Sequence, residues 1–383
     1  MRLKNLTILS LSFLLAMGYQ DASAQKKTLR EHGFPIGIFD TGKNNAITDV
    51  PGVTVGQVTC IEGDSIRTGV TAIIPHQGNI FRNKIPAAIY AGNGFGKLAG
   101  VTQVQELGNI ETPIVLTNTL NVAAGIEGLI SYTLQQPGNE NVRSVNAVVG
   151  ETNDGGLNKI QQRYVTPQIV LQALANAKPG PVEQGCVGAG TGTVAFNFKG
   201  GIGTSSRVLP KSLGGYTIGV IVQSNYGGIL EIDGVQVGQK LGVFSYKNDI
   251  PQSKSADGSC MMVVITDAPI DARNLERVAK RAMMGLAKTG GIASNGSGDY
   301  VIALSVAPEN LIDDSKKIHT QTLLDNGQMS PIFAATIEAT AEALWNSMFM
   351  AETTKGYKGY TVEALPVEKV LEMLKNREKT DKA

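Results

Sequence analysis

A serine lies at the boundary between a polar segment and an apolar one, where residues 254–269 read KSADGSCMMVVITDAP. The polar half ends at Gly258, and the run after Ser259 is typical of a buried strand. A serine hydroxyl is a weak nucleophile unless a base lies beside it. If the bond between Gly258 and Ser259 is broken, Ser259 gains a free α-amine, a base whose ordinary pKa is about 7.7 to 8.0. Cleavage would therefore create a nucleophile and its base on one residue.

Two interpretations of this boundary are open. Glycine before the serine suits self-cleavage, because a residue without a Cβ tolerates strained dihedral angles and lets the serine oxygen approach the glycine carbonyl. Taken alone, however, Asp257-Gly258-Ser259 fits an ordinary turn better, since such dipeptides are common in turns. The preceding segment, 243–258, holds a proline, several Ser and Lys residues and little apolar content, which predicts an exposed loop prone to disorder. A loop that ends on a strand-initiating serine is also the arrangement expected of a self-processing precursor.

Other catalytic chemistries find little support in the sequence. The three histidines do not lie near a G-x-S-x-G motif, so a Ser-His-Asp triad is not indicated, and each is expected in a turn or at the surface. The three cysteines are odd in number and lack metal-ligand spacing, which predicts neither a disulfide framework nor a metal site. Cys260 opens an apolar strand and is predicted to be a buried structural thiol. These residues are His32, His76, His319, Cys60, Cys186 and Cys260.

Composition and motifs argue against nucleic-acid-binding and nucleotide-cofactor-binding proteins. The formal net charge is +1 and aromatic residues make up 5% of the 383 residues, so nothing indicates nucleic-acid binding. The glycine-rich stretches GNGFGKLAG and GAGTGTVAF match neither the dinucleotide-binding nor the P-loop pattern. The sequence therefore predicts no cofactor.

The N-terminus has the features of a secretory signal peptide. Two basic residues precede an apolar stretch of about 12 residues, and Ala22-Ser23-Ala24 supplies a cleavage site. The apolar stretch is shorter than the roughly 20 residues needed to span a bilayer, and no cysteine follows the site to accept a lipid. We therefore expect a signal peptide over residues 1–24, a mature chain that starts near Gln25, and a periplasmic or secreted protein.

Strand and helix patterns mostly alternate along the mature chain. Asp233-Gly234 predicts the turn of a hairpin, Asp271 precedes an amphipathic helix, and Ser330-Pro331 predicts a helix N-cap followed by proline. Buried strands with helices between them favour a layered α/β or α+β architecture. The predicted strands are 71–76, 111–118, 146–152, 216–224, 261–267 and 300–306, and a last helix is expected over 366–377.

Five blocks of sequence resemble the P1 family of serine peptidases, family S58. These are the DmpA-like L-aminopeptidase/D-Ala-esterase/amidases, and their relatives include β-aminopeptidases. The resemblance covers nearly all of the mature chain from about Arg30. The blocks are NAITDVPGVTVGQVT (45–59), NGFGKLAGVTQVQELGNIETPIVLTNTLNV (93–122), CVGAGTGTVAFNFKGGIGTSSR (186–207), DGSCMMVVITDAPI (257–270) and GGIASNGSGDYVIALS (290–305).

The resemblance implies an α+β fold arranged as a four-layer αββα sandwich. It also implies self-cleavage into an α subunit (25–258) and a β subunit (259–383) that stay together, and a homo-oligomer of such αβ heterodimers. Ser259 matches the family nucleophile and Gly258 the residue before the cut. Asn225 matches the side chain that stabilises the oxyanion, and Ser297 with Asp299 match a pair near the nucleophile; in some members the second position is Glu.

Glu151 matches an acidic residue that receives the free amine of the substrate. A carboxylate there would explain selection for unblocked N-termini, because an ammonium is costly to desolvate without a counter-charge. The expected activity is hydrolysis of short peptides, amides or esters with a free amino group, without cofactor, nucleic acid or membrane. Two alternatives remain: an acyltransferase of the ornithine acetyltransferase type, whose members use threonine, and an exported binding module. Asn225 and the 297–299 segment also fit plain turns.

Overall fold

The computed structural model describes residues 26–247 and 258–380, which contain two larger β-sheets, two two-stranded sheets and seven α-helices. The predicted signal peptide and most of the predicted loop 243–258 lie outside the described residues. Within the described ranges, no helix is both long and apolar enough to cross a membrane.

The larger sheet carries the serine that the sequence singled out. Its strand order is β13-β3-β12-β11-β10-β9, with β4 paired to β3. Strands β10, β11 and β12 lie at its centre; β11 is antiparallel to β10 and parallel to β12. The strands are β3 (Asn83–Gly94), β4 (Asn109–Ile110), β9 (Ile202–Val208), β10 (Thr217–Asn225), β11 (Ser259–Thr266), β12 (Gly298–Ser305) and β13 (Ile312–Asp313).

The smaller sheet has the order β1-β2-β5-β6 and is antiparallel except between β5 and β6. Two short hairpins complete the strands, β7 with β8 and β14 with β15. The strands of the smaller sheet are β1 (Thr54–Glu62), β2 (Ile66–Ile74), β5 (Ile114–Asn118) and β6 (Val148–Thr152). Those of the hairpins are β7 (Val194–Ala195), β8 (Phe198–Lys199), β14 (Thr354–Lys355) and β15 (Thr361–Val362).

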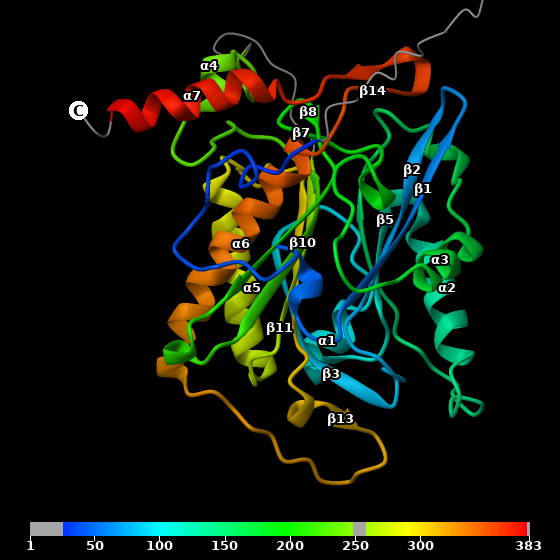
Figure 1. Ribbon diagram of the computed structural model, residues 1–383. Coiled ribbons are helices and arrows are strands. Elements are labelled where there is room, and N and C mark those ends of the chain that lie inside the picture. The colour runs from blue at the N-terminus through cyan, green and yellow to red at the C-terminus, as the bar shows by residue number, and fades with distance from the viewer. Residues whose placement is uncertain (1–25, 248–257, 381–383) are drawn as a thin grey trace, which may run out of the picture.

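Helices lie on the outer sides of the two sheets (Figure 1). Helices α5 (Ala272–Lys288) and α6 (Met329–Phe349) pack against the larger sheet, and α2 (Val122–Leu134) and α3 (Pro167–Ala175) lie beside the smaller one. Helix α5 follows Asp271, as predicted, and Asp271 caps it by accepting a hydrogen bond from the Asn274 backbone N–H. The remaining helices are α1 (Val101–Leu107), α4 (Val237–Leu241) and α7 (Val367–Thr380).

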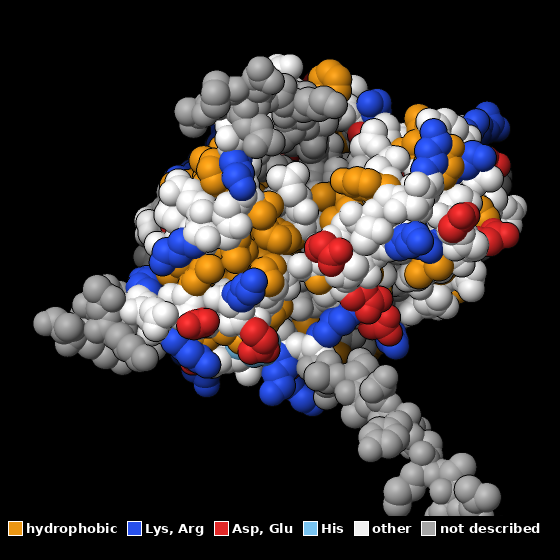
Figure 2. Space-filling model, turned by 90° about the horizontal axis from the view of Figure 1, so that it is seen from above, with side chains coloured by type: hydrophobic (Ala, Val, Ile, Leu, Met, Phe, Trp, Pro, Cys, Tyr) orange, Lys and Arg blue, Asp and Glu red, His pale blue; other side chains and the backbone are white. Residues whose placement is uncertain are grey.

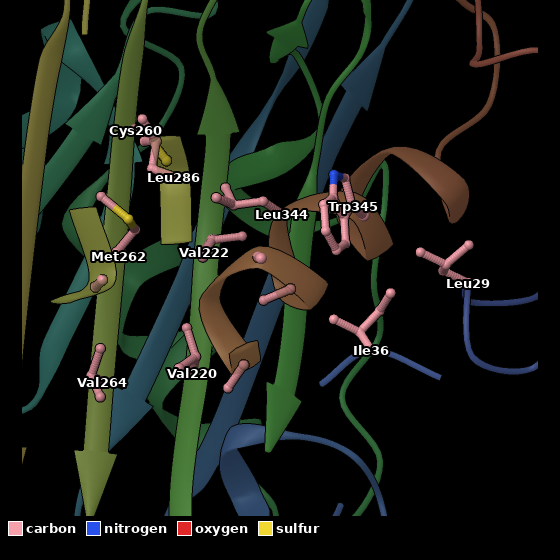
Figure 3. Packing of buried hydrophobic residues seen from close by; sticks show 14 of the residues in the cluster. Leu29, Ile36, Val220, Val222, Cys260, Met262, Val264, Leu286, Leu344 and Trp345 are labelled. Atoms are coloured by element: carbon pink, nitrogen blue, oxygen red, sulfur yellow. The ribbon is translucent and has the colours of Figure 1, made fainter. Parts of the chain in front are cut away.

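Strands β10 and β11 are buried on both faces, and successive side chains point to opposite sides. On one side Val222 and Met262 share a cluster with Leu344 and Trp345 of α6 (Figure 3). On the other side residues such as Met261 pack with side chains of the smaller sheet. The strand that starts with Ser259 is therefore held in the middle of the molecule, between helices and a second sheet.

The predicted mixture of α and β structure is confirmed, and each predicted strand overlaps an observed one. The turn predicted at Asp233-Gly234 is confirmed, and an antiparallel bridge joins Ile232 to Val235 across it. The hairpin extends no further, because the chain enters α4 directly afterwards. The prediction at Ser330 is wrong: Ser330 is not an N-cap, since α6 begins at Met329 and takes Ser330-Pro331 into its first turn.

Candidate active site

Three strand ends meet at Ser259. The residue is the first of β11, and its partners in the ladder are Asn225, the last residue of β10, and Gly298, the first of β12. Ser259 is buried, with 5% of its surface exposed. The hydrogen-bond register of one sheet therefore brings together segments that are 34 and 39 residues away along the chain.

The carbonyl of Gly258 belongs to the bond that the sequence predicts to be cut. Its oxygen accepts a hydrogen bond from Ser259 Oγ at 2.7 Å and another from the Gly298 backbone N–H at 3.2 Å. The same N–H lies 3.3 Å from Ser259 Oγ. The nucleophile thus lies against the carbonyl it would attack, and a fixed backbone donor faces the oxygen on which charge would develop.

Glycine is required at position 258 by packing as well as by chemistry. A Cβ there would lie 2.7 Å from Tyr226 Cα and 3.1 Å from the Asn225 carbonyl oxygen. Both are backbone atoms, so no side-chain rotation can relieve the contact. The close approach of these two backbones is what places the Gly258 carbonyl beside the strand ends.

The Asn225 side chain has a defined orientation. Its Oδ1 accepts a hydrogen bond of 2.9 Å from the Val194 backbone N–H. Only the oxygen of the side-chain amide can accept a hydrogen bond from a backbone N–H, so the Asn225 Nδ2 points away from Val194. Among the described residues Nδ2 has no acceptor, and Asn225 lines the same cavity as Ser259. The amide N–H is thus available to a substrate oxygen.

Ser297 and Asp299 are hydrogen-bonded to each other, with Ser297 Oγ donating to Asp299 Oδ1 at 2.8 Å. Asp299 is fully buried, and its Oδ2 has no partner within the described residues. Burial raises the pKa of Asp299 to about 6, although hydrogen bonds from Ser297 and from the Cys260 backbone act in the opposite direction. The pair flanks Gly298, the ladder partner of Ser259, but in the intact chain no hydrogen bond between described residues joins either side chain to Ser259.

Glu151 comes from the other sheet, at the fourth position of β6. Its Oε1 accepts from the Lys97 backbone N–H at 2.9 Å, and its Oε2 accepts from the Thr119 hydroxyl. The side chain is buried, and burial raises its pKa above the usual range of a carboxyl group. A buried carboxylate held by two donors has lone pairs left to accept hydrogen bonds from a substrate ammonium.

A cavity of about 430 Å³ connects these groups. Ser259, Asn225 and Glu151 line it, whereas Ser297 and Asp299 do not. Three aromatic residues also line it, Phe95, Tyr226 and Tyr360. Figure 2 looks down on the end of the molecule nearest these strand ends, where hydrophobic side chains gather near the centre and charged ones lie mostly toward the rim.

Several groups that contact the candidate site residues or line the cavity were not identified from the sequence. The Gly298 N–H donor is invisible in sequence because it is a backbone group that the β11–β12 register brings to Ser259. Thr119 follows β5 and carries no motif of its own. The two aromatic residues at positions 95 and 360 come from segments far apart in the chain, and only folding places them at one cavity.

The cysteine and histidine predictions can be compared with the structure. Cys260 is a buried thiol, as predicted, and burial raises its pKa well above the usual value. All three cysteines are free, and none of the three histidines lines the cavity. Among the described residues, no three His, Cys, Asp or Glu side chains are grouped so that they could hold a metal ion.

A buried serine that begins a central strand, and whose hydroxyl donates to the carbonyl of the preceding glycine, is the arrangement expected of a hydrolase of the N-terminal nucleophile type. Comparison with known proteins agrees with this class. The model of Peptidase family S58 matches residues 45–362, and the chain belongs to that family. It is a serine aminopeptidase/amidase of the family.

The relatives have similar lengths. A β-peptidyl aminopeptidase, BapA of Sphingosinicella microcystinivorans, is 36% identical over 375 residues, which cover 92% of this chain and 93% of the relative. The solved structure of the PH0078 protein from Pyrococcus horikoshii OT3 is 43% identical, with a TM-score of 0.84, over 92% of this chain and 99% of that one. The L-aminopeptidase D-Ala-esterase/amidase of Ochrobactrum anthropi, described as a variant of the Ntn hydrolase fold, is 32% identical, with the same TM-score and coverage.

Proposed function

We propose that the chain is a precursor that cleaves itself between Gly258 and Ser259 and then hydrolyses short substrates through an acyl-enzyme on Ser259. The observation that carries the proposal is the Gly258 carbonyl, which lies 2.7 Å (oxygen to oxygen) from the Ser259 hydroxyl and is polarised by the Gly298 N–H.

Maturation would proceed by an N-to-O acyl shift. Ser259 Oγ attacks the Gly258 carbonyl carbon, and the developing oxyanion keeps its hydrogen bond from the Gly298 N–H. The C–N bond then breaks, the hydroxyl proton passes to the departing nitrogen, and an ester links Gly258 to Ser259 Oγ. Water hydrolyses this ester, which leaves a carboxylate on Gly258 and a free α-amine and hydroxyl on Ser259.

Turnover would use the same hydroxyl with its new base. The α-amine of Ser259 takes the hydroxyl proton as Oγ attacks the substrate carbonyl, and Asn225 Nδ2 stabilises the oxyanion. The proton goes to the leaving group, which departs as an amine or alcohol, and water releases the acyl group. One backbone donor near Gly258 and one side-chain amide in the cavity would thus serve the two stages.

The substrate's free amine would bind Glu151. Because Glu151 and Ser259 line one cavity of about 430 Å³, we expect short acyl groups that reach from one to the other. Relatives named β-peptidyl aminopeptidase and L-aminopeptidase D-Ala-esterase/amidase make β-amino acyl and L-aminoacyl anilides the first compounds to test. Peptides, amides and esters with a free amino group form the proposed substrate class.

The two products of cleavage would remain one folded unit. Strand β11 of the 259–383 piece is hydrogen-bonded to β10 of the 25–258 piece, and β12 is hydrogen-bonded to β3. Cutting before Ser259 breaks none of these ladders.

We also propose the four-layer αββα sandwich, a homo-oligomer of these heterodimers, and export directed by a signal peptide over residues 1–24.

Intact mass spectrometry of the purified protein beside the Ser259→Ala variant tests the proposal. Wild type should give two masses, which correspond to a piece ending at Gly258 and the piece 259–383, whereas the variant should stay whole. The wild type alone should then hydrolyse an aminoacyl p-nitroanilide. A wild-type chain that stays whole would show that Ser259 is not a self-made nucleophile.

A further inference from the structure

A lysine is buried in the loop whose Val194 N–H bonds to the Asn225 side chain. Lys199 ends β8 and has no exposed surface. Its Nζ donates to the carbonyl oxygens of Gly190 at 2.9 Å and Gly200 at 2.8 Å. Burying an ammonium is expensive without hydrogen-bond partners, and burial lowers the pKa of Lys199. This lysine therefore ties together the two ends of one loop, residues 190–200, from inside the protein.

The loop it closes is a two-residue hairpin. Phe196 and Asn197, the two central residues of the β7–β8 turn, have φ angles of 52° and 65°. Tight hairpin turns need such values at both positions, and asparagine adopts them readily, but they are rare for a bulky residue such as Phe196. Phe196 donates its backbone N–H to the Tyr226 carbonyl at 2.8 Å, and the two rings pack edge to face at 4.8 Å. The hairpin is thus fastened to the residue that follows Asn225.

The hairpin's function at the site depends on Val194. Val194 is the ladder partner of Lys199, and its N–H is the donor that holds Asn225 Oδ1 at 2.9 Å. The Gly200 end of the loop is anchored as well, because Gly200 N–H donates to the Thr193 carbonyl at 3.1 Å. A continuous set of contacts therefore joins the buried ammonium to the Asn225 amide (Figure 1 shows β7 and β8 beside the end of β10).

We propose that Lys199 is a positioning residue for catalysis: by holding Gly190 and Gly200 together it sets the Val194 N–H, which fixes the Asn225 amide with its N–H toward the substrate. The inference rests on the proposed role of Asn225 in turnover. Lys199 touches neither Ser259 nor the cavity, so it acts only through the hairpin. Without it, the amide can rotate or move away from the oxyanion, and kcat falls while substrate binding at Glu151 is kept.

Self-cleavage should respond differently. The Gly258 carbonyl takes its hydrogen bonds from Ser259 and Gly298, and none from Asn225 or the hairpin. Loss of Lys199 should therefore leave maturation complete while it slows turnover. If Lys199 were purely structural, its loss would instead lower thermal stability, and it would affect both self-cleavage and turnover or neither of them.

The first experiment compares Lys199→Met with wild type and with Asn346→Leu. Asn346 is also fully buried and bridges backbone groups, through Leu29 N–H and the Thr204 carbonyl, but lies outside the cavity. On protein shown by mass spectrometry to be cleaved, Lys199→Met should lower kcat about 10- to 100-fold with KM changed less than about threefold. Asn346→Leu should lower the melting temperature and leave kcat near wild type. If Lys199→Met does not fold, Lys199→Gln carries the same comparison.

The deciding measurement is a double-mutant cycle with Asn225→Ala. If Lys199 works through Asn225, Lys199→Met should lower kcat by less than about twofold once Asn225 is already Ala. An equal loss in both backgrounds would overturn the inference, as would a folded Lys199→Met variant that fails to cleave itself. If Asn225→Ala alone keeps wild-type kcat, the inference falls with the role of Asn225, although hydrolysis by wild type would still support the proposed function.

Discussion

The two sides of the cavity are built in different ways. On the proposed nucleophile side, Asn225, Ser259 and Gly298 are ladder partners at the ends of three adjacent strands. On the proposed amine-binding side, Glu151 comes from the smaller sheet, and its carboxylate is held by two groups outside that sheet's strands, the Lys97 N–H and the Thr119 hydroxyl. The first side is thus positioned by the register of neighbouring strands, whereas on the second side the carboxylate is oriented by hydrogen bonds from connecting segments.

We expect this difference to separate the residues that carry out the reaction from those that select the substrate. Backbone ladders in a core that is buried on both faces leave little room for adjustment, which suits atoms that must meet to within fractions of an ångström. Connecting segments can change without moving the ladder. We therefore expect substitutions on the nucleophile side to lower cleavage or kcat, and substitutions on the amine side to raise KM.

The largest effect should come from Gly258→Ala. Its Cβ would lie 2.7 Å from Tyr226 Cα, so the backbone must move and the carbonyl must leave its place beside Ser259 Oγ. We expect self-cleavage to slow at least 100-fold by mass spectrometry over time. Gly94→Ala is the control, because a Cβ at this nearby glycine meets no atom within 4 Å. A Gly258→Ala chain that cleaves at the wild-type rate would contradict the packing argument.

Asn225→Ala should come next. Removal of one preorganised oxyanion donor costs roughly 100- to 1000-fold in kcat, with little change in KM. The test is steady-state kinetics on cleaved protein with an aminoacyl p-nitroanilide. Asn121→Ala serves as control, since Asn121 is equally buried but bonds to the Val165 carbonyl away from the cavity. An unchanged kcat would remove Asn225 from the mechanism.

Glu151→Gln should raise KM about 10- to 100-fold, because a charged hydrogen bond to the substrate ammonium, worth about 1.5 to 3 kcal/mol, becomes neutral. Burial raises the pKa of Glu151, so the carboxylate becomes protonated at a higher pH than an exposed one. In wild type, kcat/KM should therefore fall with decreasing pH while still above pH 4.5.

In Glu151→Gln this part of the pH profile should be absent. Glu111→Gln is the matched control, since Glu111 is also buried and accepts a backbone N–H, that of Asn146, but does not line the cavity. If KM is unchanged in Glu151→Gln, the amine must bind elsewhere.

The smallest effect is a shift in pH dependence in Asp299→Asn. Burial raises the pKa of Asp299 to about 6 in the intact chain. After cleavage, the ionised Asp299 carboxylate would stabilise the ammonium form of the Ser259 α-amine. Removing the charge lowers the amine pKa, and the acid limb of kcat should move about one unit toward lower pH. Asp267→Asn, at a partly buried carboxyl just past the other end of β11, should leave the limb in place. If the acid limb of kcat stays at the same pH in Asp299→Asn, the Asp299 carboxylate does not affect the Ser259 α-amine.

The sequence predicted the central strands well, because β10, β11 and β12 are apolar runs bounded by glycine or polar residues. It predicted that α5 follows Asp271 because apolar residues in that segment recur on one face of a helix. It failed at Ser330, where burial of α6 against the larger sheet extends the helix past its local cap signal. Local patterns succeed where neighbouring residues decide the structure.

By itself, the sequence determined the strand that begins with Ser259, the glycine before it and, through resemblance, the family. Only the tertiary structure decided that the Gly298 N–H meets the Gly258 carbonyl, that Glu151 shares a cavity with Ser259, and that Lys199 bonds across the loop whose Val194 N–H holds Asn225. The physical reason is that these contacts join residues distant in the chain through sheet register and packing, which depend on the whole core.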